Sequence, residues 1–181
     1  MSSCLDGHSD TVWAVTYSPR GNQVASCSAD GTVKLWDVET GACQHTLIGH
    51  SAGIEKIVYS PNGNQIASAS DDTTVRLWDI KTGMCSHIFI GHQYAVTRVV
   101  YSPRGDQVAS AGRDDNTVRI WDLGSENVDM LCLATRRKFL TLGIHREATS
   151  FFLGVMLARR SCGMLRQEIV AGLSTLMVRQ T

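Results

Sequence analysis

The sequence predicts an all-β protein built from three four-stranded antiparallel sheets, and three observations lead to this prediction. A Gly-His pair recurs every 42 residues, at positions 7–8, 49–50 and 91–92. A Trp-Asp pair follows in each repeat, at positions 36–37, 78–79 and 121–122. The stretches between these pairs are rich in β-branched and aromatic residues and are separated by Pro, Gly, Asn and Asp, which favours short strands joined by turns.

Each repeat is expected to contain four strands. Turn residues mark the boundaries: Pro19 presets φ, Gly21 tolerates positive φ, and Asp30-Gly31 between two apolar runs predicts a hairpin. Repeats 7–48 and 49–90 are identical at 23 of 42 aligned positions. The predicted strands are 12–17, 23–28, 32–38 and 43–48, then 54–59, 65–70, 74–80 and 85–90, then 96–101, 107–111, 117–123 and 128–133.

These motifs resemble the WD-repeat (WD40) family, in which four strands form one blade of a β-propeller. The resemblance covers about 7–133 and implies a WD-repeat region at 1–133 that forms a partial β-propeller with blades at about 7–48, 49–90 and 91–133. The near-identical copies are also similar to fungal WD-repeat signalling arrays, which follow a nucleotide-binding switch domain. The phosphate-binding string G-x-x-x-x-G-K-[ST] of such a domain does not occur here.

The resemblance also implies a buried hydrogen-bonded chain of His, Ser, Asp and Trp in every blade. An indole N–H that is buried needs an acceptor, and a serine hydroxyl can supply it. A His/Ser/Asp set could instead be a catalytic triad, but threefold repetition with no distinct copy favours a structural role. The matching residues are His8, Ser26, Asp30 and Trp36, then His50, Ser68, Asp72 and Trp78, then His92, Ser110, Asp115 and Trp121.

Binding specificity is expected where the repeats differ, mainly just after each Gly-His pair. The resemblance places these positions at the start of the innermost strands, on the narrower face of the propeller. Trp13 is the sharpest candidate, either as an exposed binding anchor or packed beneath a neighbouring loop. The predicted partner-binding face consists of Thr11, Trp13, Glu55, Lys56, Asp71, Tyr94, Thr97, Arg98 and Asp114.

Neither a metal nor a cofactor is expected. Cys43 with His45, and Cys85 with His87, have a spacing that could suit zinc, but outer strands of successive blades splay apart. The six cysteines include no C-x-x-C pair, and the first ten residues contain no apolar signal segment. We therefore expect reduced thiols in a cytoplasmic or nuclear protein.

The segment 134–181 lacks the repeat motifs and differs in charge. Residues 1–123 contain 9 basic and 13 acidic side chains, whereas 124–181 contain 8 and 4. Apolar residues at helical spacing, such as Phe151, Val155 and Leu165, suit a basic amphipathic helix pair that caps a blade or contacts a membrane. The alternative is a disordered or non-native end. No motif supports nucleic-acid binding.

The function predicted from these features is a protein-protein interaction scaffold in signalling or complex assembly that binds proteins or peptides. A membrane-associated protein acting through its tail is the alternative, and a hydrolase is less favoured; no enzymatic activity is expected. Propellers usually have four to eight blades, so three blades leave two open sides. Self-association through these sides, a place in a longer propeller, or marginal stability are the expected consequences.

Overall fold

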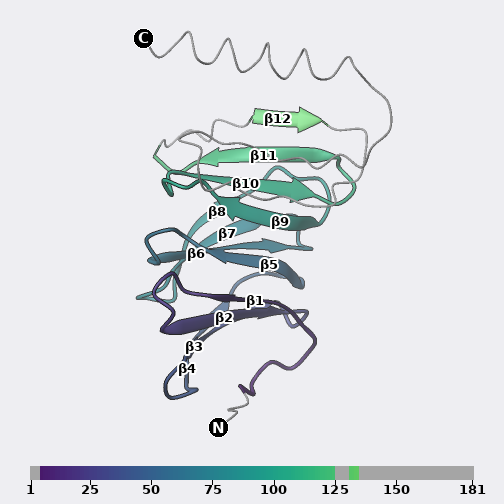
Figure 1. The fold of residues 1–181 in the computed structure, drawn as a ribbon. Coiled ribbons are helices and arrows are strands. Elements are labelled where there is room, and N and C mark those ends of the chain that lie inside the picture. The colour runs from purple at the N-terminus through teal and green to yellow at the C-terminus, as the bar shows by residue number, and fades with distance from the viewer. Residues whose placement is uncertain (1–4, 125–130, 135–181) are drawn as a thin grey trace, which may run out of the picture.

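A computed structural model describes residues 5–124 and 131–134 and contains twelve strands in three four-stranded antiparallel sheets (Figure 1). This confirms the predicted all-β partial propeller. The first blade contains β1 (Val12–Tyr17), β2 (Gln23–Ser28), β3 (Thr32–Asp37) and β4 (Cys43–Ile48). The second contains β5 (Ile54–Tyr59), β6 (Gln65–Ser70), β7 (Val75–Asp79) and β8 (Cys85–Phe89). The third contains β9 (Val96–Tyr101), β10 (Gln107–Gly112), β11 (Thr117–Asp122) and β12 (Leu131–Ala134).

Six of the twelve predicted strands need boundary corrections; 32–38, 85–90 and 117–123 each end one residue earlier than predicted, and 107–111 ends one residue later. The strand predicted at 74–80 begins at Val75, because Thr73 adopts a positive φ of 72° and Thr74 hydrogen-bonds through its amide to the Asp72 carboxylate at 3.0 Å. The last strand was predicted at 128–133 and lies at Leu131–Ala134. The tail predicted at 134–181 begins at the last residue of β12; its remainder, with the helical or membrane-contacting alternatives, lies outside the described residues. No helix in the described part of the chain is long and apolar enough to cross a bilayer.

The three sheets stack one upon another, with β1, β5 and β9 as neighbours along the stack (Figure 1). Apolar cores lie between consecutive blades rather than within one sheet. Ile54, Ile57 and Tyr59 of β5 are 0–6% exposed and belong to one core with Ala25 and Leu35 of the first blade. An equivalent core joins the second and third blades. The blades therefore depend on each other for burial, as expected of a repeat protein.

Candidate binding face and its supporting hydrogen-bond network

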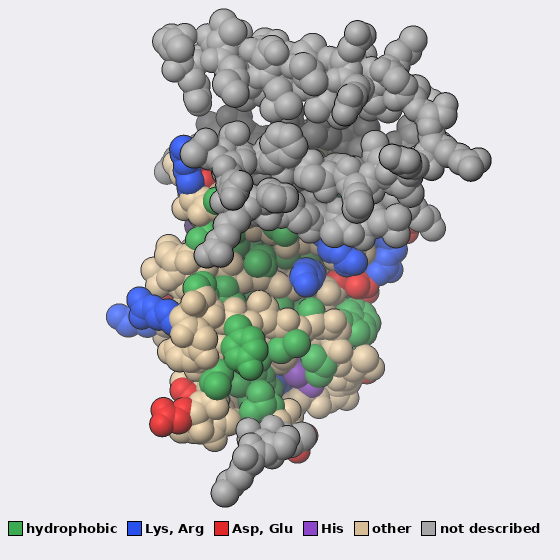
Figure 2. Space-filling view, in the orientation of Figure 1, with side chains coloured by type: hydrophobic (Ala, Val, Ile, Leu, Met, Phe, Trp, Pro, Cys, Tyr) green, Lys and Arg blue, Asp and Glu red, His purple; other side chains and the backbone are tan. Residues whose placement is uncertain are grey.

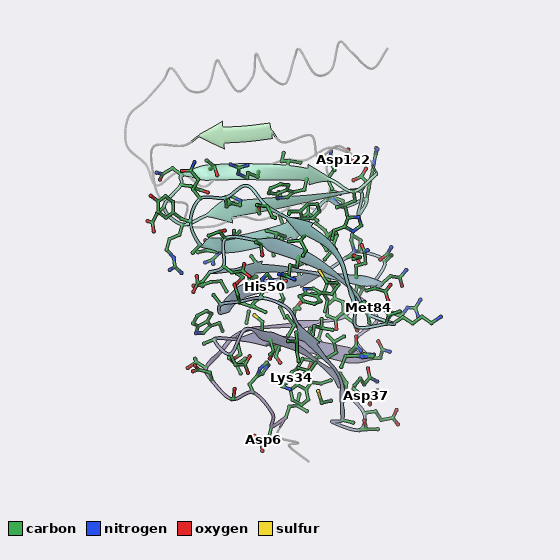
Figure 3. All side chains as sticks on the ribbon, turned by 180° about the vertical axis from the view of Figure 1, so that it is seen from behind. Asp6, Lys34, Asp37, His50, Met84 and Asp122 are labelled. Atoms are coloured by element: carbon green, nitrogen blue, oxygen red, sulfur yellow. The ribbon has the colours of Figure 1, made fainter. Side chains whose placement is uncertain are left out.

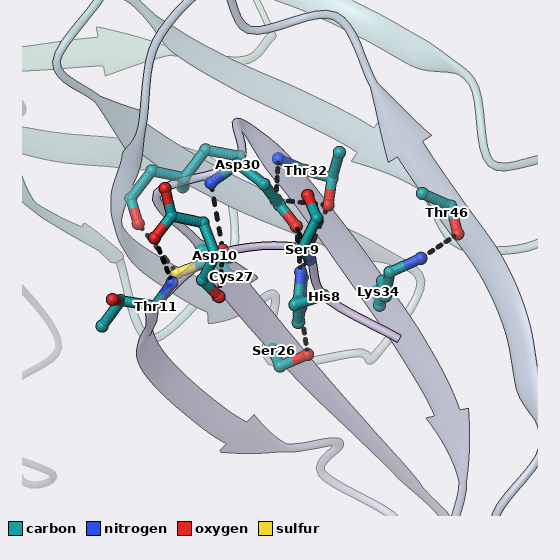
Figure 4. A network of polar contacts seen from close by, with 12 residues as sticks. His8, Ser9, Asp10, Thr11, Ser26, Cys27, Asp30, Thr32, Lys34 and Thr46 are labelled. Atoms are coloured by element: carbon teal, nitrogen blue, oxygen red, sulfur yellow. Dashed lines mark hydrogen bonds and ion pairs between the residues drawn. The ribbon is translucent and has the colours of Figure 1, made fainter. Parts of the chain in front are cut away.

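Four side chains form a hydrogen-bonded chain through the first blade towards its loop end, and Figure 4 shows its part from Ser26 through His8 to Asp30. The indole Nε1 of Trp36 lies 2.8 Å from Oγ of Ser26, which lies 2.8 Å from Nε2 of His8. Nδ1 of His8 is 2.9 Å from a carboxylate oxygen of Asp30. The four residues come from β2, β3 and two loops, so the chain ties together segments that are separate in sequence.

The donor and acceptor of each hydrogen bond in this network follow from the chemistry of the two groups at its ends, the indole and the carboxylate. An indole N–H can only donate, so Ser26 Oγ accepts from Trp36. The serine hydroxyl then donates its own proton to Nε2 of His8, which leaves the proton of the imidazole on Nδ1. That N–H donates to Asp30. The arrangement is satisfied throughout with a neutral histidine and an ionised aspartate.

The other two blades repeat the same geometry. Trp78 and Trp121 each donate to a serine at 2.8 Å, and the histidine Nε2–serine distances are 2.7 and 2.8 Å. The histidine–aspartate distances are 2.7 and 2.5 Å. The structure thus brings together all twelve residues predicted for the network: His8, Ser26, Asp30, Trp36, His50, Ser68, Asp72, Trp78, His92, Ser110, Asp115 and Trp121.

A threonine that sequence reasoning missed completes each network. Thr32 Oγ1 donates to Asp30 at 2.7 Å, and Thr74 and Thr117 occupy the same position in their blades. Threonine recurs here with the period of the repeat, so the sequence did contain the signal. Burial alone would raise the pKa of Asp30, but the hydrogen bonds from Thr32 and His8 outweigh it and hold that pKa well below its usual range.

The network has the Ser–His–Asp order of a catalytic triad, yet its hydroxyl is not available to a substrate. Ser68 and Ser110 are fully buried and Ser26 is 7% exposed. Each hydroxyl also already accepts an indole N–H. A nucleophile must reach the reacting carbonyl, so these contacts support a structural role for the set.

Each network ends beneath a pair of loops that form one end of the blade. In the first blade the amide of Ala29 donates to the carbonyl of Thr11 at 2.9 Å. The equivalent bonds join Asp71 to Gly53 at 2.9 Å and Arg113 to Ala95 at 2.8 Å. We call the end formed by residues 9–13, 29–31, 51–55, 71–73, 93–97 and 113–116 the loop face. Asp37, Met84 and Asp122 lie along one side of the stack, on the turns and strand ends away from these loops (Figure 3).

Trp13 lies on the loop face where the first blade meets the second. Its ring packs over Gly53, where a Cβ would lie only 2.6 Å from the ring and 3.3 Å from the Cα of Ala29. The side chain remains 41% exposed. Trp13 therefore packs against the loop of the following blade while keeping a solvent-facing surface, and it does not cover the open side of the first blade.

A charged cluster occupies the matching place between the second and third blades. Arg113 forms an ion pair with Glu55 and lies 3.8 Å from Asp71. Both carboxylates belong to the predicted partner-binding face, whereas Arg113 does not. Arg113 follows Asp71 by the 42-residue period and makes the equivalent backbone hydrogen bond, so the period is the signal that could have found it.

The remaining predicted face residues are distributed around this cluster. Tyr94 is 53% exposed, and Thr11, Arg98 and Asp114 are also exposed, whereas Lys56 and Thr97 are half-buried. Arg98 donates to the carbonyl of Thr97 at 2.7 Å. The loop face thus offers one aromatic contact region, around Trp13, and one charged region, around Glu55.

The cysteine–histidine pairs considered as metal ligands serve other contacts. Cys43 and Cys85 donate to backbone carbonyls of His45 and His87, at 3.5 and 3.3 Å. Within residues 5–124, no group of three His, Cys, Asp or Glu side chains could hold a metal ion. Cys27, Cys43 and Cys85 are free thiols, and burial raises the pKa of Cys27 to about 12.

Comparison with known proteins places this architecture in a family. The model of the family described as "WD domain, G-beta repeat" matches residues 1–37, 41–79 and 83–122, more than half of the chain. The chain belongs to the WD40 family. Human striatin-4 is 54% identical over 37 residues, which are 20% of this chain and 5% of striatin-4.

Two further WD40 relatives match over similarly short stretches. Eukaryotic translation initiation factor 3 subunit I of Pyricularia oryzae is 45% identical over 40 residues, 22% of this chain and 12% of that protein. A probable cytosolic iron-sulfur protein assembly protein CIAO1 homolog of Ixodes scapularis is 42% identical over 48 residues, 25% of this chain and 15% of the relative. The chain matches only a small part of the length of each relative.

Proposed function

We propose that this WD40 chain is a non-catalytic scaffold that binds another protein or a peptide through its loop face. One observation carries the proposal: the recurring His, Ser, Asp and Trp residues form buried networks, while the repeats differ most just after each Gly-His pair, at one end of the blades. Trp13 is 41% and Tyr94 53% exposed there. Aromatic and arginine side chains are the usual anchors of protein interfaces.

The chemistry of the loop face suggests how a partner is recognised. Trp13 is already held on one side by Gly53, so a partner would bury a ring whose orientation is set in advance. The pair of Glu55 and Arg113 provides both charges for register and for exclusion of wrong partners. A partner that places an apolar side chain on Trp13 and a charged group beside Glu55 suits this face.

The names of two relatives are consistent with work in multiprotein assemblies: one is a subunit of a translation initiation factor and one an assembly protein. A role of this chain in signalling or complex assembly is inferred by analogy. A cytoplasmic or nuclear location, and self-association through open blade sides, also stay predictions, tested respectively by imaging the tagged chain and by its mass in solution.

Affinity capture from cell extract tests the loop face. We expect proteins captured by the wild-type chain to be lost with Trp13→Ala and with Glu55→Ala. Arg20→Ala, in an exposed turn outside the loop face, is the matched control and should capture the same proteins. Capture unchanged by both loop-face variants would refute the proposed face.

A further inference from the structure

Two basic side chains occupy equivalent positions at the loop-face ends of neighbouring strands. Lys56 of β5 and Arg98 of β9 lie at the same place in their repeats, where the first repeat has Ala14. We call Lys56 and Arg98 the basic pair. Lys56 is half-buried and Arg98 is exposed, and β5 and β9 contact each other along the stack. Figure 2 shows basic side chains gathered towards the right-hand edge of the visible face, with acidic side chains beside them.

A β-bulge lies directly before each position of the basic pair. In the pairing of the first two strands of each blade, one residue of the first strand has no partner. The unpaired residue is Trp13 in β1, Glu55 in β5 and Thr97 in β9. A bulge of this kind bends the strand and redirects the side chains beside it. The basic pair therefore follows directly on two redirected residues of the loop face, Glu55 and Thr97.

Neither charge of the basic pair is neutralised within the described residues. Arg98 donates to the backbone carbonyl of Thr97 at 2.7 Å, and neither Lys56 nor Arg98 forms an ion pair with a described carboxylate. Glu55 pairs instead with Arg113. Like charges without a counter-charge repel each other, so an anion bound between them relieves this repulsion.

The charge of the surrounding blades decides which kind of anion suits the basic pair. Residues 1–123 contain 9 basic and 13 acidic side chains, so an extended polyanion such as nucleic acid is repelled by the blades as a whole. Glu55 and Asp71, at the same end of the second blade, also disfavour the double charge of a phosphate group. A single carboxylate adds only one negative charge and suits the fork of an arginine guanidinium.

Trp13 supplies an apolar contact close to the basic pair. Its ring is 41% exposed at the seam between the first and second blades. Burial raises the pKa of the Cys27 thiol in β2 to about 12, and the positive charge of Lys56 opposes this rise, so Lys56 acts electrostatically across the same seam. One short peptide segment could therefore contact both the Trp13 ring and the basic pair.

We infer that the loop face binds a protein segment that carries an aspartate or glutamate close to an apolar residue. The carboxylate binds between Lys56 and Arg98, and the apolar side chain packs on Trp13. This inference rests on the proposed function and names the chemistry of the partner. Arg113 stays paired with Glu55, so the basic pair sets the sign of the charge that the partner presents.

Fluorescence anisotropy with the full chain tests the sign of that charge. The probe is a short rhodamine-labelled peptide in which a leucine is followed by glutamates, flanked by glycine and serine. Two comparison peptides carry glutamine or lysine in place of glutamate. We expect the glutamate peptide to bind about tenfold more tightly than the glutamine peptide, and the lysine peptide to bind most weakly. Added salt should reduce the difference.

Variants of the basic pair test its position. Lys56→Ala with Arg98→Ala gives both positions the residue of the first repeat, Ala14, so the fold should be kept. Binding of the glutamate peptide should fall about tenfold, to the level of the glutamine peptide. Arg20→Gln with Arg104→Gln removes the same charge from exposed turns outside the loop face and is the matched control. Lys56→Glu with Arg98→Glu should reverse the preference towards the lysine peptide.

The outcomes separate this inference from the proposed function. Equal binding of the glutamate and glutamine peptides to the wild-type chain overturns the inference even if a variant fails to fold. An equal loss with the matched control also overturns it, and a phosphoserine peptide that binds where the glutamate peptide does not overturns the choice of a carboxylate. Capture from extract that is lost with Trp13→Ala but survives Lys56→Ala with Arg98→Ala removes this inference and leaves the proposed function intact.

Discussion

The seam between the first and second blades and the seam between the second and third share one kind of apolar core but end differently on the loop face. The first seam ends with Trp13 packed on Gly53. The second ends with Glu55, Arg113 and Asp71. The repeated residues therefore build the same kind of apolar core at both seams. Substitutions at the loop-face end of a seam change the contact there from aromatic to charged without altering that core.

The hydrogen-bond networks within the blades should weaken in acid. Hydrogen bonds hold the pKa values of Asp30, Asp72 and Asp115 below the ordinary 3.8, despite the opposing effect of burial. The folded protein then binds fewer protons than the unfolded chain, so this stabilisation is complete above about pH 5 and is lost as the pH falls below about 4. Urea unfolding at several pH values should show a shallower acid loss for Asp72→Asn than for the wild type. Asp114→Asn, an exposed control, should keep the wild-type slope.

Breaking one network should weaken both seams of the second blade. His50→Ala leaves the 5%-exposed carboxylate of Asp72 without its imidazole and should cost about 3 kcal/mol of the free energy of unfolding. His87→Ala, at an exposed histidine of β8, should cost under about 0.5 kcal/mol. Urea denaturation followed by tryptophan fluorescence measures both. Equal costs would contradict the structural role of the network.

The first seam can be broken alone. Gly53→Ala adds a Cβ 2.6 Å from the Trp13 ring and should destabilise the chain by about 1–2 kcal/mol. Iodide quenching of Trp13, the most exposed of the four tryptophans, should increase. In a Trp13→Ala background the same change should be nearly neutral. If Gly53→Ala still lowered the free energy of unfolding in the Trp13→Ala variant, a clash with the indole ring would not be the cause of the destabilisation.

Two substitutions in turns of the loop face should instead raise the free energy of unfolding. Thr73 has a positive φ where the first blade has Gly31, and a β-branched residue is strained there. Thr73→Gly should raise the free energy of unfolding by about 0.5–1 kcal/mol, the strain relief exceeding the entropy that glycine adds to the unfolded chain. Asn116→Gly should gain less, because asparagine tolerates this conformation. Thermal unfolding would detect the order of the two gains.

The charged cluster at the loop-face end of the second seam should contribute least to stability. Arg113 is 48% exposed at its side chain, so Arg113→Ala should cost at most about 0.5–1 kcal/mol, and less at high salt. Arg104→Ala, in an exposed turn, is the matched control. A cost well above that of Gly53→Ala would reverse the comparison between the seams.

The strands of the repeated region could be predicted closely because each motif occurs three times at a nearly fixed spacing. Eleven of the twelve predicted strands start and end within one residue of the observed ones on the strength of period and turn chemistry alone, for example 12–17 and 54–59. The environment of Trp13 could not be predicted this way. It depends on Gly53, forty residues later, and on the absence of a side chain there, which no pattern within one repeat reveals.

The fit between Trp13 and Gly53 also limits how these repeats could be rearranged. If the third blade followed the first, Ala95 would face the indole; if the first were duplicated in tandem, Thr11 would face it. Either side chain would occupy space that the ring now fills. Copies alike enough to recombine are therefore not interchangeable, and one missing methyl group helps to fix their order along the gene.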